Sequence, residues 1–588
     1  MTTTDLEGGT TDRSFGEGHA AAGGLVDLTD DRGFLGHPKG LAILFFAELW
    51  ERFSFYGMRS LLVLYLVQHF LFDPGKAQGL YAAYGSLVYL MPVIGGFIAD
   101  RYLGHRRAVL IGAIFLTLGH GLMAFEGSGS QAFIETEGER YELVTEGRGE
   151  EAQSFLRDSG NLRPVTYVDG NMVLGGEGTA PDRIEKDAFE QVVEQQEVYV
   201  QTLFLALSLI IVGVGFLKAN ISTMVGQLYG ERDPRRDPGF TIFYVGINLG
   251  SLAAYITCGW LAYEYGWGYG FGAAGIGMLL GLVVFVLGKP LLRGRGEHKM
   301  TVSGGVKAAA WIGGVIALAP LWFLVQRDEL VATILYWAAP ALYVGLLIYA
   351  LTAFKAEVRS RMVVAIVLTT FSVLFWALFE QAGSSLTLYA ANNSTLPGFL
   401  NAAQVGFLNP GFIILLGPVF AWLWMTLAKR GAEPSTPVKF SLGLAQVGLG
   451  FIVLAWGASA FASEVQTANG IKYVVPFVFL AAAYLLHSTG ELCLSPVGLS
   501  MVTKLAAPSV VGLMMGAWFV SSALGHTVAG YIAKLTATET AGGVVTDSAG
   551  QLATYVDVFM TVGFVGLGVA VFLLVLSPFL KKGMAGIH

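Results

Sequence analysis

Glu48-Leu49-Trp50-Glu51-Arg52 lies inside an apolar run that extends from residue 41 to residue 68. The run is long enough for a helix to cross a bilayer. Ionisable side chains near the middle of such a helix cost several kcal/mol each unless they are paired or face water. Helical geometry gathers charged and aromatic side chains within an arc of about 140°, and these are Glu48, Glu51, Arg52, Phe55, Tyr56 and Arg59. This stripe must therefore face a protein interior or a wet cavity, and its charges are functional candidates.

The composition of the chain is typical of a polytopic membrane protein. Of the 588 residues, 54% are hydrophobic and only 13% are charged. These values exclude an ordinary soluble globular protein. The two cysteines, Cys258 and Cys493, both lie in apolar segments, so the sequence offers no disulfide framework and no thiol metal site.

Apolar runs of spanning length predict fourteen transmembrane helices. The expected fold class is therefore an all-α polytopic membrane protein. The runs lie at residues 41–68, 79–99, 107–125, 199–226, 240–262, 268–288, 307–326, 333–354, 361–390, 405–428, 439–461, 473–502, 509–534 and 554–579.

The distribution of charge predicts how these helices are oriented. An even number of helices places both termini on one side of the membrane. The loops on that side carry clusters of Lys and Arg, such as 101–107, 289–299 and 581–582. The positive-inside rule assigns that side to the cytoplasm. Residues 1–40 are polar, Gly-rich and acidic, and we expect them to form a disordered cytoplasmic tail.

One loop on the opposite side is long and acidic. Residues 126–197 carry 17 acidic and 6 basic side chains. Short alternating pieces at 141–144 and 164–168 predict one or two hairpins, and a polar helix is expected near 184–198. Two interpretations stay open: the loop is a solvated appendage, or it takes part in substrate binding.

Four motifs resemble those of the proton-coupled oligopeptide transporters, a branch of the major facilitator superfamily. The resemblance extends over residues 40 to 510. The motifs are Glu48-x-x-Glu-Arg-Phe-Ser-Phe-Tyr-Gly57 of the first helix, Phe243-Tyr-x-x-Ile-Asn-x-Gly-Ser251 of the fifth, Gly490-Glu-Leu-x-Leu-Ser-Pro-x-Gly498 of the tenth, and the loop motif Gly96-x-x-x-Asp-Arg-x-x-Gly-x-Arg-Arg107.

The resemblance implies the major facilitator fold, with two six-helix bundles and, as in bacterial members, two inserted helices. The N-terminal bundle would cover residues 41–288 and include the insertion 126–197. The linker 289–358 would contain the two extra helices, and residues 359–588 would form the C-terminal bundle.

Arg52 and Arg59 are seven residues apart and lie on one helix face. Arg presents a forked donor that suits a carboxylate. The resemblance implies that both help to hold the C-terminus of a peptide. The alternative for Arg52 is that it only neutralises Glu48 and Glu51, and both roles can hold if the pair exchanges partners.

Glu48 and Glu51 form a carboxylate pair with one nearby cation. Like charges held close together, out of water, favour the binding of a proton by one of them. Such a proton would release Arg52 for the substrate. We therefore expect Glu48, Glu51 and Arg52 to couple transport to protons.

Lys218 and Glu491 are lone charges in apolar runs. Lys218 needs an anion, and the resemblance places it across from the first helix, where Glu48, Glu51 or a substrate carboxylate could meet it. The resemblance implies that Glu491 meets the α-ammonium of a peptide. The alternatives are a Lys218 side chain that reaches toward the membrane surface, and a structural Glu491–Lys218 ion pair.

Glu380 is a further acid within an apolar run, toward the side opposite the termini. The resemblance implies an outer gate, in which Arg59 and Glu380 pair when the outside is closed and separate when Glu380 is protonated. The alternative is an unpaired Glu380 that faces a polar pocket.

A weaker group of candidates consists of polar and aromatic residues that match pocket positions of the family. Tyr and Trp in membrane proteins also serve as interfacial or packing residues. One departure from the family pattern is Phe55-Tyr56, which replaces a Tyr-Tyr pair and removes a hydroxyl. The candidates are Tyr56, Tyr89, Asn248, Asn409 and Trp518, while no role is assigned to His120, His487 and His526.

These observations predict a proton-coupled symporter that imports di- and tripeptides by alternating access. The alternatives are the same fold with another small substrate, such as an amino acid, nitrate or a drug-like acid, and a peptide sensor that does not transport. We find no motif of an enzyme, and expect no metal, no cofactor other than the coupling proton, and no nucleic-acid partner. We expect a monomer in the lipid bilayer of a bacterial inner membrane.

Overall fold

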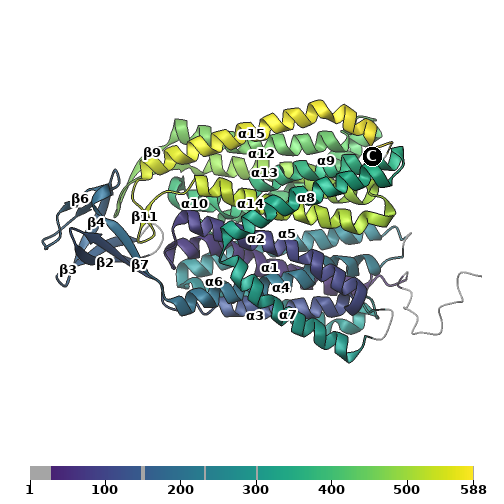
Figure 1. Cartoon of the computed structure of the whole chain (residues 1–588), viewed down its shortest axis with the longest axis horizontal. Helices are drawn as coiled ribbons and strands as arrows, with labels where there is room; N and C mark the ends of the chain where they lie inside the picture. The colour runs from purple at the N-terminus through teal and green to yellow at the C-terminus, as the bar shows by residue number, and fades with distance from the viewer. Residues whose placement is uncertain (1–27, 29, 148–151, 231–232, 299–301, 587–588) are drawn as a thin grey trace, which may run out of the picture.

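A computed structural model describes residues 28, 30–147, 152–230, 233–298 and 302–586. It consists of a long helical body with a small β-sheet at one end (Figure 1). The C-terminus lies at the other end of the body, and so does the beginning of α1.

The helices follow the predicted apolar runs. The first group is α1 (Lys39–Gln68), α2 (Pro74–Ile98), α3 (His105–Met123), α4 (Glu197–Gln227), α5 (Arg236–Tyr265) and α6 (Trp267–Leu287). The next two are α7 (Gly304–Val325) and α8 (Asp328–Ala353). The last group is α9 (Ala356–Phe379), α10 (Ser385–Asn393), α11 (Leu408–Lys429), α12 (Thr436–Phe461), α13 (Phe477–Leu505), α14 (Val511–Leu535) and α15 (Ser548–Gly583).

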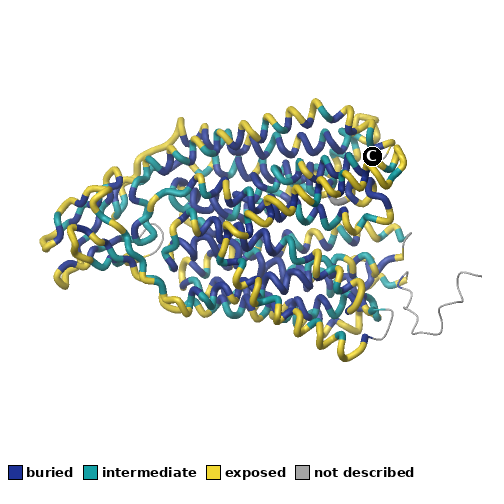
Figure 2. The backbone as a smooth tube through the Cα atoms, in the orientation of Figure 1, coloured by how far each residue is buried: buried dark blue, intermediate teal, exposed yellow. Residues whose placement is uncertain are grey.

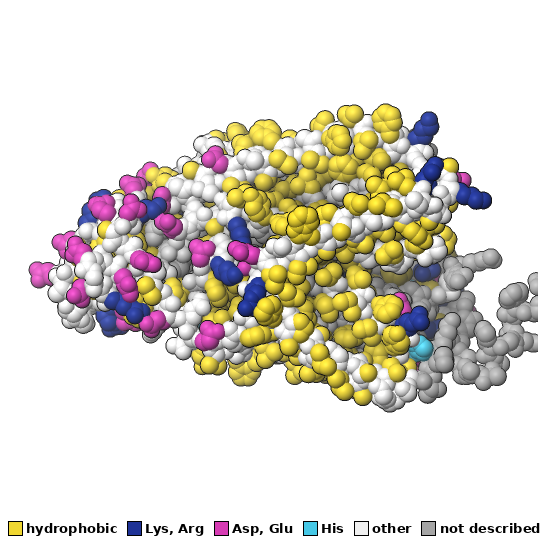
Figure 3. All heavy atoms as spheres, viewed as in Figure 1, with side chains coloured by type: hydrophobic (Ala, Val, Ile, Leu, Met, Phe, Trp, Pro, Cys, Tyr) yellow, Lys and Arg dark blue, Asp and Glu magenta, His cyan; other side chains and the backbone are white. Residues whose placement is uncertain are grey.

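The membrane character of these helices is confirmed. Among the described residues, thirteen helical segments are long and apolar enough to cross a membrane. The long helix α1 is not among them, because Glu48, Glu51, Arg52 and Arg59 of the stripe lie within it. Figure 3 shows hydrophobic side chains covering the helical body, acidic ones gathered on the sheet, and basic ones at the opposite end. Figure 2 shows buried residues running along the inside of the body.

Each group of helices packs closely on itself. Helix α1 packs on α5 and α6, and α3 packs on α4; in the other group α12 packs on α15 and α13, and α14 on α9. Glycines permit these contacts, since a Cβ on Gly112 would lie 2.6 Å from the carbonyl oxygen of Gly213, and one on Gly448 2.8 Å from that of Gly563. The groups meet where α2 contacts α14 and where α5 contacts α11, while α8 contacts α2, α9 and α14.

A short 3-10 turn, η5 (Glu380–Gly383), interrupts the apolar run predicted at 361–390. Helix α9 ends before it and α10 begins after it. Such interruptions often mark functional positions. Here the turn carries Glu380 at its first residue.

The insertion 126–197 forms most of the sheet. Its strands are β1 (Gln131–Thr136), β2 (Glu139–Glu146), β3 (Gln153–Asp158), β4 (Asn161–Val168), β5 (Asn171–Leu174), β6 (Arg183–Ile184) and β7 (Glu190–Glu194), in the order β6-β5-β4-β3-β2-β1-β7. The predicted hairpins are present, but the helix predicted near 184–198 is wrong. That segment forms β6, a 3-10 turn and β7, because Val192 of β7 pairs with Phe133 of β1, far away in the sequence.

Two loops of the second group extend this sheet. Between α12 and α13 lie β9 (Ser463–Thr467) and β10 (Gly470–Pro476), and β10 pairs with β4 and with β8 (Ser394–Thr395). Asn469 accepts from the backbone N–H of Ser154 at 2.8 Å and donates to the carbonyl of Ala152 at 2.7 Å. Between α14 and α15, the hairpin β11 (Thr540–Ala541) and β12 (Val544–Val545) places Gly542, whose N–H donates to Gln191 at 2.9 Å. The sheet therefore contacts both groups of helices.

The predicted tail, 1–40, needs a correction at its C-terminal end. Residues 1–27 and 29 lie outside the described residues, but the rest of the segment is ordered. Arg235 donates to the carbonyl oxygens of Leu28 at 3.3 Å and Asp31 at 2.9 Å. His37 lies 2.9 Å from the Tyr229 hydroxyl. These tertiary hydrogen bonds hold a segment whose composition alone suggests disorder.

Candidate functional site

The charged stripe of α1 is buried, and Arg52 lies between the two acids. Its Nε is 2.8 Å from Glu48 Oε1 and 2.6 Å from Glu51 Oε2. The three side chains are at most 6% exposed. The second oxygen of each acid, Glu48 Oε2 and Glu51 Oε1, has no hydrogen-bond partner among the described residues. One cation thus faces two carboxylates in a buried site. The cluster has an excess negative charge, which a second positive charge would neutralise.

Lys218 of α4 supplies a cation close to this cluster, but it forms no ion pair with a described carboxylate. Its Nζ lies over the ring of Tyr89 on α2, at 3.7 Å from the centroid. It interacts electrostatically with Arg52, Glu51 and Glu48. Lys218 therefore interacts with Glu48 and Glu51 through their charges and not by direct contact. No carboxylate among the described residues forms an ion pair with this half-buried side chain.

Glu491 of α13 is the complementary group in the second set of helices. Its Oε2 accepts from Asn409 of α11 at 3.0 Å, and the same amide lies 3.1 Å from the Ser488 hydroxyl. Among the described residues no Lys or Arg pairs with Glu491, so the alternative ion pair with Lys218 is not formed. A half-buried anion whose side chain has only a neutral partner can accept an external cation.

Arg59 and Glu380 meet between the two groups of helices. The Arg59 guanidinium forms an ion pair with Glu380 Oε2 and donates to the Tyr81 hydroxyl of α2. His526 of α14 lies on the same carboxylate oxygen, at 3.4 Å through Nε2. The structure thus brings together the two residues predicted as an outer gate, and it adds Tyr81 and His526.

Tyr56 lies among charges from both groups of helices. It interacts electrostatically with Arg52, Arg59, Glu380 and Glu491, and its ring packs on Tyr255 of α5 at 5.9 Å. The charged residues of the two groups therefore surround one aromatic side chain.

Asn248 and Trp518 are placed less directly. Asn248 donates to the carbonyl of Tyr244 in its own helix, at 3.0 Å. Trp518 packs against Gly498 of α13. Neither forms a hydrogen bond with the charged residues among those that the structure describes.

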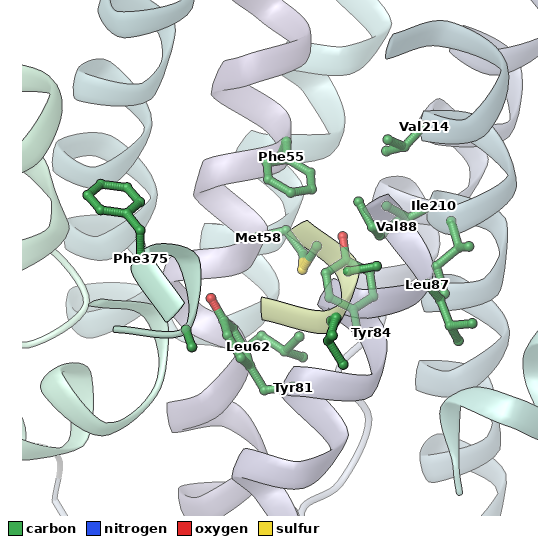
Figure 4. Close-up of a cluster of buried hydrophobic side chains, with 14 of the residues drawn as sticks. Phe55, Met58, Leu62, Tyr81, Tyr84, Leu87, Val88, Ile210, Val214 and Phe375 are labelled. Atoms are coloured by element: carbon green, nitrogen blue, oxygen red, sulfur yellow. The ribbon is translucent and has the colours of Figure 1, made fainter. Parts of the chain in front are cut away.

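An apolar layer supports the site from α1, α2 and α4. Figure 4 shows Phe55 and Met58 of α1 facing Tyr84 and Val88 of α2, with Ile210 of α4 behind them. All five are buried. The residue Phe55, where the family pattern has a hydroxyl, packs edge-on against Tyr56 at 5.3 Å.

Sequence reasoning missed Tyr81. The sequence of α2 does not distinguish Tyr81 from Tyr84, and only the fold shows that Arg59 donates to Tyr81. It left His526 without a role for the same reason. The only local signal for His526 is a polar side chain inside a spanning run, which His120 and His487 share.

Comparison with known proteins agrees with the resemblance that the sequence motifs indicate. The model of the POT family, PTR2, matches residues 106–547. The chain is 34% identical to the uncharacterized transporter YclF of Bacillus subtilis (strain 168) over 584 residues, which cover 96% of this chain and 98% of the relative. The chain belongs to the POT family.

Two further POT relatives are similar over most of their length. The peptide transporter YePEPT of Yersinia enterocolitica is 32% identical over 85% of this chain and 88% of its own. The crystal structure of a mutant peptide transporter POT in complex with alafosfalin has a TM-score of 0.72 and 32% identity, and covers 95% of this chain and 100% of its own. The major facilitator fold predicted from the motifs is thereby confirmed, and this POT family member is a membrane transporter by descent.

Proposed function

We propose that this chain is a proton-coupled symporter that imports di- and tripeptides by alternating access. One observation carries the proposal: among the described residues, a cation without an ion pair and an anion without an ion pair lie in opposite groups of helices. Lys218 is on one side, close to the Arg52 cluster, and Glu491 is on the other. A free peptide has a carboxylate at one end and an ammonium at the other, so it complements this arrangement without contacts to its side chains.

The Arg52 cluster supplies the coupling to protons. A proton that binds to Glu51 removes one of the two charges that hold Arg52. Arg52 is then free to bind the peptide carboxylate, and Glu48 stays as its remaining partner. Binding of a proton and binding of a peptide thus favour each other, which is a coupling between sites.

The ion pair between Arg59 and Glu380 serves as the gate on the side of the sheet. It joins α1 to η5, so the outer ends of the two groups are held together. Protonation of Glu380 would remove its attraction for Arg59 and allow these ends to separate. In the described state Arg59 and Glu380 are paired, so this gate is closed.

The proposal includes a location. The basic end of the body, which holds both ends of the described chain, faces the cytoplasm (Figure 3). The sheet then lies outside a bacterial inner membrane, and the chain works as a monomer in the lipid bilayer. No cofactor is needed beyond the coupling proton.

Uptake into proteoliposomes tests the proposal. With an acidic exterior and an inside-negative potential, we expect purified protein to accumulate dialanine, because each 100 mV adds about 2.3 kcal/mol per charge. Dialanine blocked at either terminus should neither compete nor raise the melting temperature, and nitrate should not compete since Glu491 opposes a plain anion. Absence of accumulation under this gradient would refute the proposal.

A further inference from the structure

His526 lies against the gate, and the proposed mechanism so far makes no use of it. The side chain is 3% exposed. Its Nδ1 is 3.0 Å from the carbonyl oxygen of Ser522, one turn earlier in α14. Its Nε2 is 3.4 Å from Glu380 Oε2. Both ring nitrogens therefore have assigned neighbours.

These neighbours determine where the hydrogen of the ring lies. A backbone carbonyl oxygen only accepts, so Nδ1 carries the hydrogen in that contact. In the neutral ring, Nε2 then presents a lone pair, and it faces a carboxylate oxygen that also only accepts. A proton between Nε2 and Oε2 turns this repulsive contact into a charge-assisted hydrogen bond. The geometry therefore forms a proton-binding position.

Other charged and titratable groups around the ring come from three further helices. Arg59 of α1 occupies the same Glu380 oxygen. Tyr89 of α2 packs on the His526 ring at 4.7 Å, and Tyr81 of α2 completes the gate. Lys218 of α4 interacts with the ring electrostatically. The two cations oppose a charged imidazole while Arg59 is in place, so protonation of His526 and departure of Arg59 favour each other.

We propose that His526 is the positioning residue that accepts the gate proton and shares it with Glu380. Hydronium in the extracytoplasmic water gives a proton to Nε2, so one O–H bond breaks, one N–H bond forms, and a water molecule is released. Glu380 then has a cationic partner and no longer requires Arg59. The proton leaves by the reverse step, to water on the other side, when Arg59 returns to Glu380. This proposal rests on the proton-coupled function proposed above.

The positions of His526 and Glu380, which share the proton, explain how this step would help the two groups of helices to separate. His526 and Glu380 belong to the same group of helices, whereas Arg59 and Tyr81 belong to the other. The proton thus stays with one group while the two groups separate, and Glu380 is never left as a buried, unpaired charge. Such a charge costs several kcal/mol.

A chain of contacts connects this position to the peptide site. Tyr89 lies between Lys218, at 3.7 Å from its centroid, and His526, whose ring centroid is 4.7 Å away. A peptide carboxylate that draws Lys218 away from Tyr89 removes a cation from the surroundings of His526. Peptide binding at the centre therefore favours the proton at the gate.

The test compares two substitutions of His526 with one control substitution in proteoliposomes. His526→Gln keeps a neutral donor toward Glu380 but takes no proton at neutral pH. His526→Asn keeps the donor toward Ser522 but is too short to reach Glu380. His120→Gln is the matched control, since His120 is 1% exposed and lies in α3 away from the gate. Each variant is assayed for proton-driven dialanine uptake between pH 5 and 8, and for counterflow without a gradient, which requires exchange but no net proton movement.

We expect both His526 variants to lose about tenfold or more of the driven uptake, and to lose its pH dependence, while counterflow stays within about twofold of the parent protein. His120→Gln should behave like the parent. A parent-like pH profile in His526→Gln would overturn the inference, and so would equal losses of uptake and counterflow, which indicate a structural role. If the parent protein itself shows no driven uptake, the proposed function fails and this inference falls with it.

Discussion

At the scale of single residues, the identity of the charged groups could be predicted but their partners could not. The cost of a charge inside a spanning helix singles out Glu51, Arg52, Lys218 and Glu491 from the sequence alone. Whether Lys218 meets a carboxylate or the face of Tyr89 depends on how α2 and α4 pack. That contact joins residues of two different helices, so it cannot be predicted from the local sequence of either one.

Glu51→Gln tests the coupling at this scale. The substitution preserves size but removes the proposed proton site and one of the two charges that pair with Arg52. We expect proton-driven uptake to fall about tenfold or more, as for loss of a coupling free energy of about 1–3 kcal/mol. Counterflow should persist in part. Glu264→Gln, at an exposed position of α5, is the control. Equal loss of both activities would indicate a role in folding or binding instead.

The buried carboxylate of Asp158 gives a prediction for how the stability of the sheet depends on pH. Hydrogen bonds from the Thr179 hydroxyl and the Ala180 N–H hold the pKa of its carboxyl below the ordinary value. The Arg163 guanidinium, 1% exposed, lies 3.3 Å away. The stability from this group is present above the ordinary pKa of Asp and is lost as the pH falls through the lowered one.

We therefore expect the sheet to lose stability progressively as the pH falls below about 4, and Asp158→Asn to remove that pH dependence by destabilising the sheet at neutral pH as well. Hydrogen exchange of residues 152–184 measures both effects. Unchanged protection in Asp158→Asn at neutral pH would contradict the assignment.

At the scale of elements, long helices were predictable and interruptions and pairings were not. Hydropathy over about twenty residues identifies a spanning helix, and every predicted run contains a long helix. The turn η5 is invisible to that criterion, because the apolar character continues on both sides of Glu380. The insertion shows the same limit, since pairing of β7 with β1 decides the structure of residues 184–194.

Helix α8 gives a prediction at this scale. Its first residue, Asp328, is 5% exposed and joins Lys76 of α2 and Lys534 of α14, each at 2.6 Å. Asp328→Asn leaves two ammonium groups close together without an anion, and we expect a loss of stability of about 1–3 kcal/mol. A thermal melt in detergent measures this loss. Glu329→Gln, at the exposed next position, should leave the melting temperature unchanged; a similar loss there would point to helix-end effects.

At the scale of the whole molecule, the sheet joins the two groups of helices outside the gate. Strands β1 to β7 lie between α3 and α4 in the chain. Asn469 and Gly542, from loops of the other group, nevertheless form hydrogen bonds with the sheet. If the outer ends separate during transport, these bonds must break in every cycle. We therefore expect the sheet to favour the closed form of the proposed outer gate.

A reversible cross-link tests that consequence. Ser154→Cys with Asn469→Cys should form a disulfide that stops uptake until a reductant is added. Each single variant is a control, and the native Cys258 and Cys493 are buried. Uptake at the parent rate in the oxidised double variant would mean that the sheet and the loop move as one body.

The acidity of the sheet has a consequence for solutes before they reach the membrane. Residues 126–197 hold 17 acidic and 6 basic side chains, and many of the acids point outward from the sheet (Figure 3). A field of this sign concentrates positively charged solutes at the entrance and depletes negative ones. Lysine-containing peptides should thus arrive faster than aspartate-containing ones at low ionic strength. That preference should fade as added salt shortens the screening length to about 8 Å, while the maximal turnover stays the same.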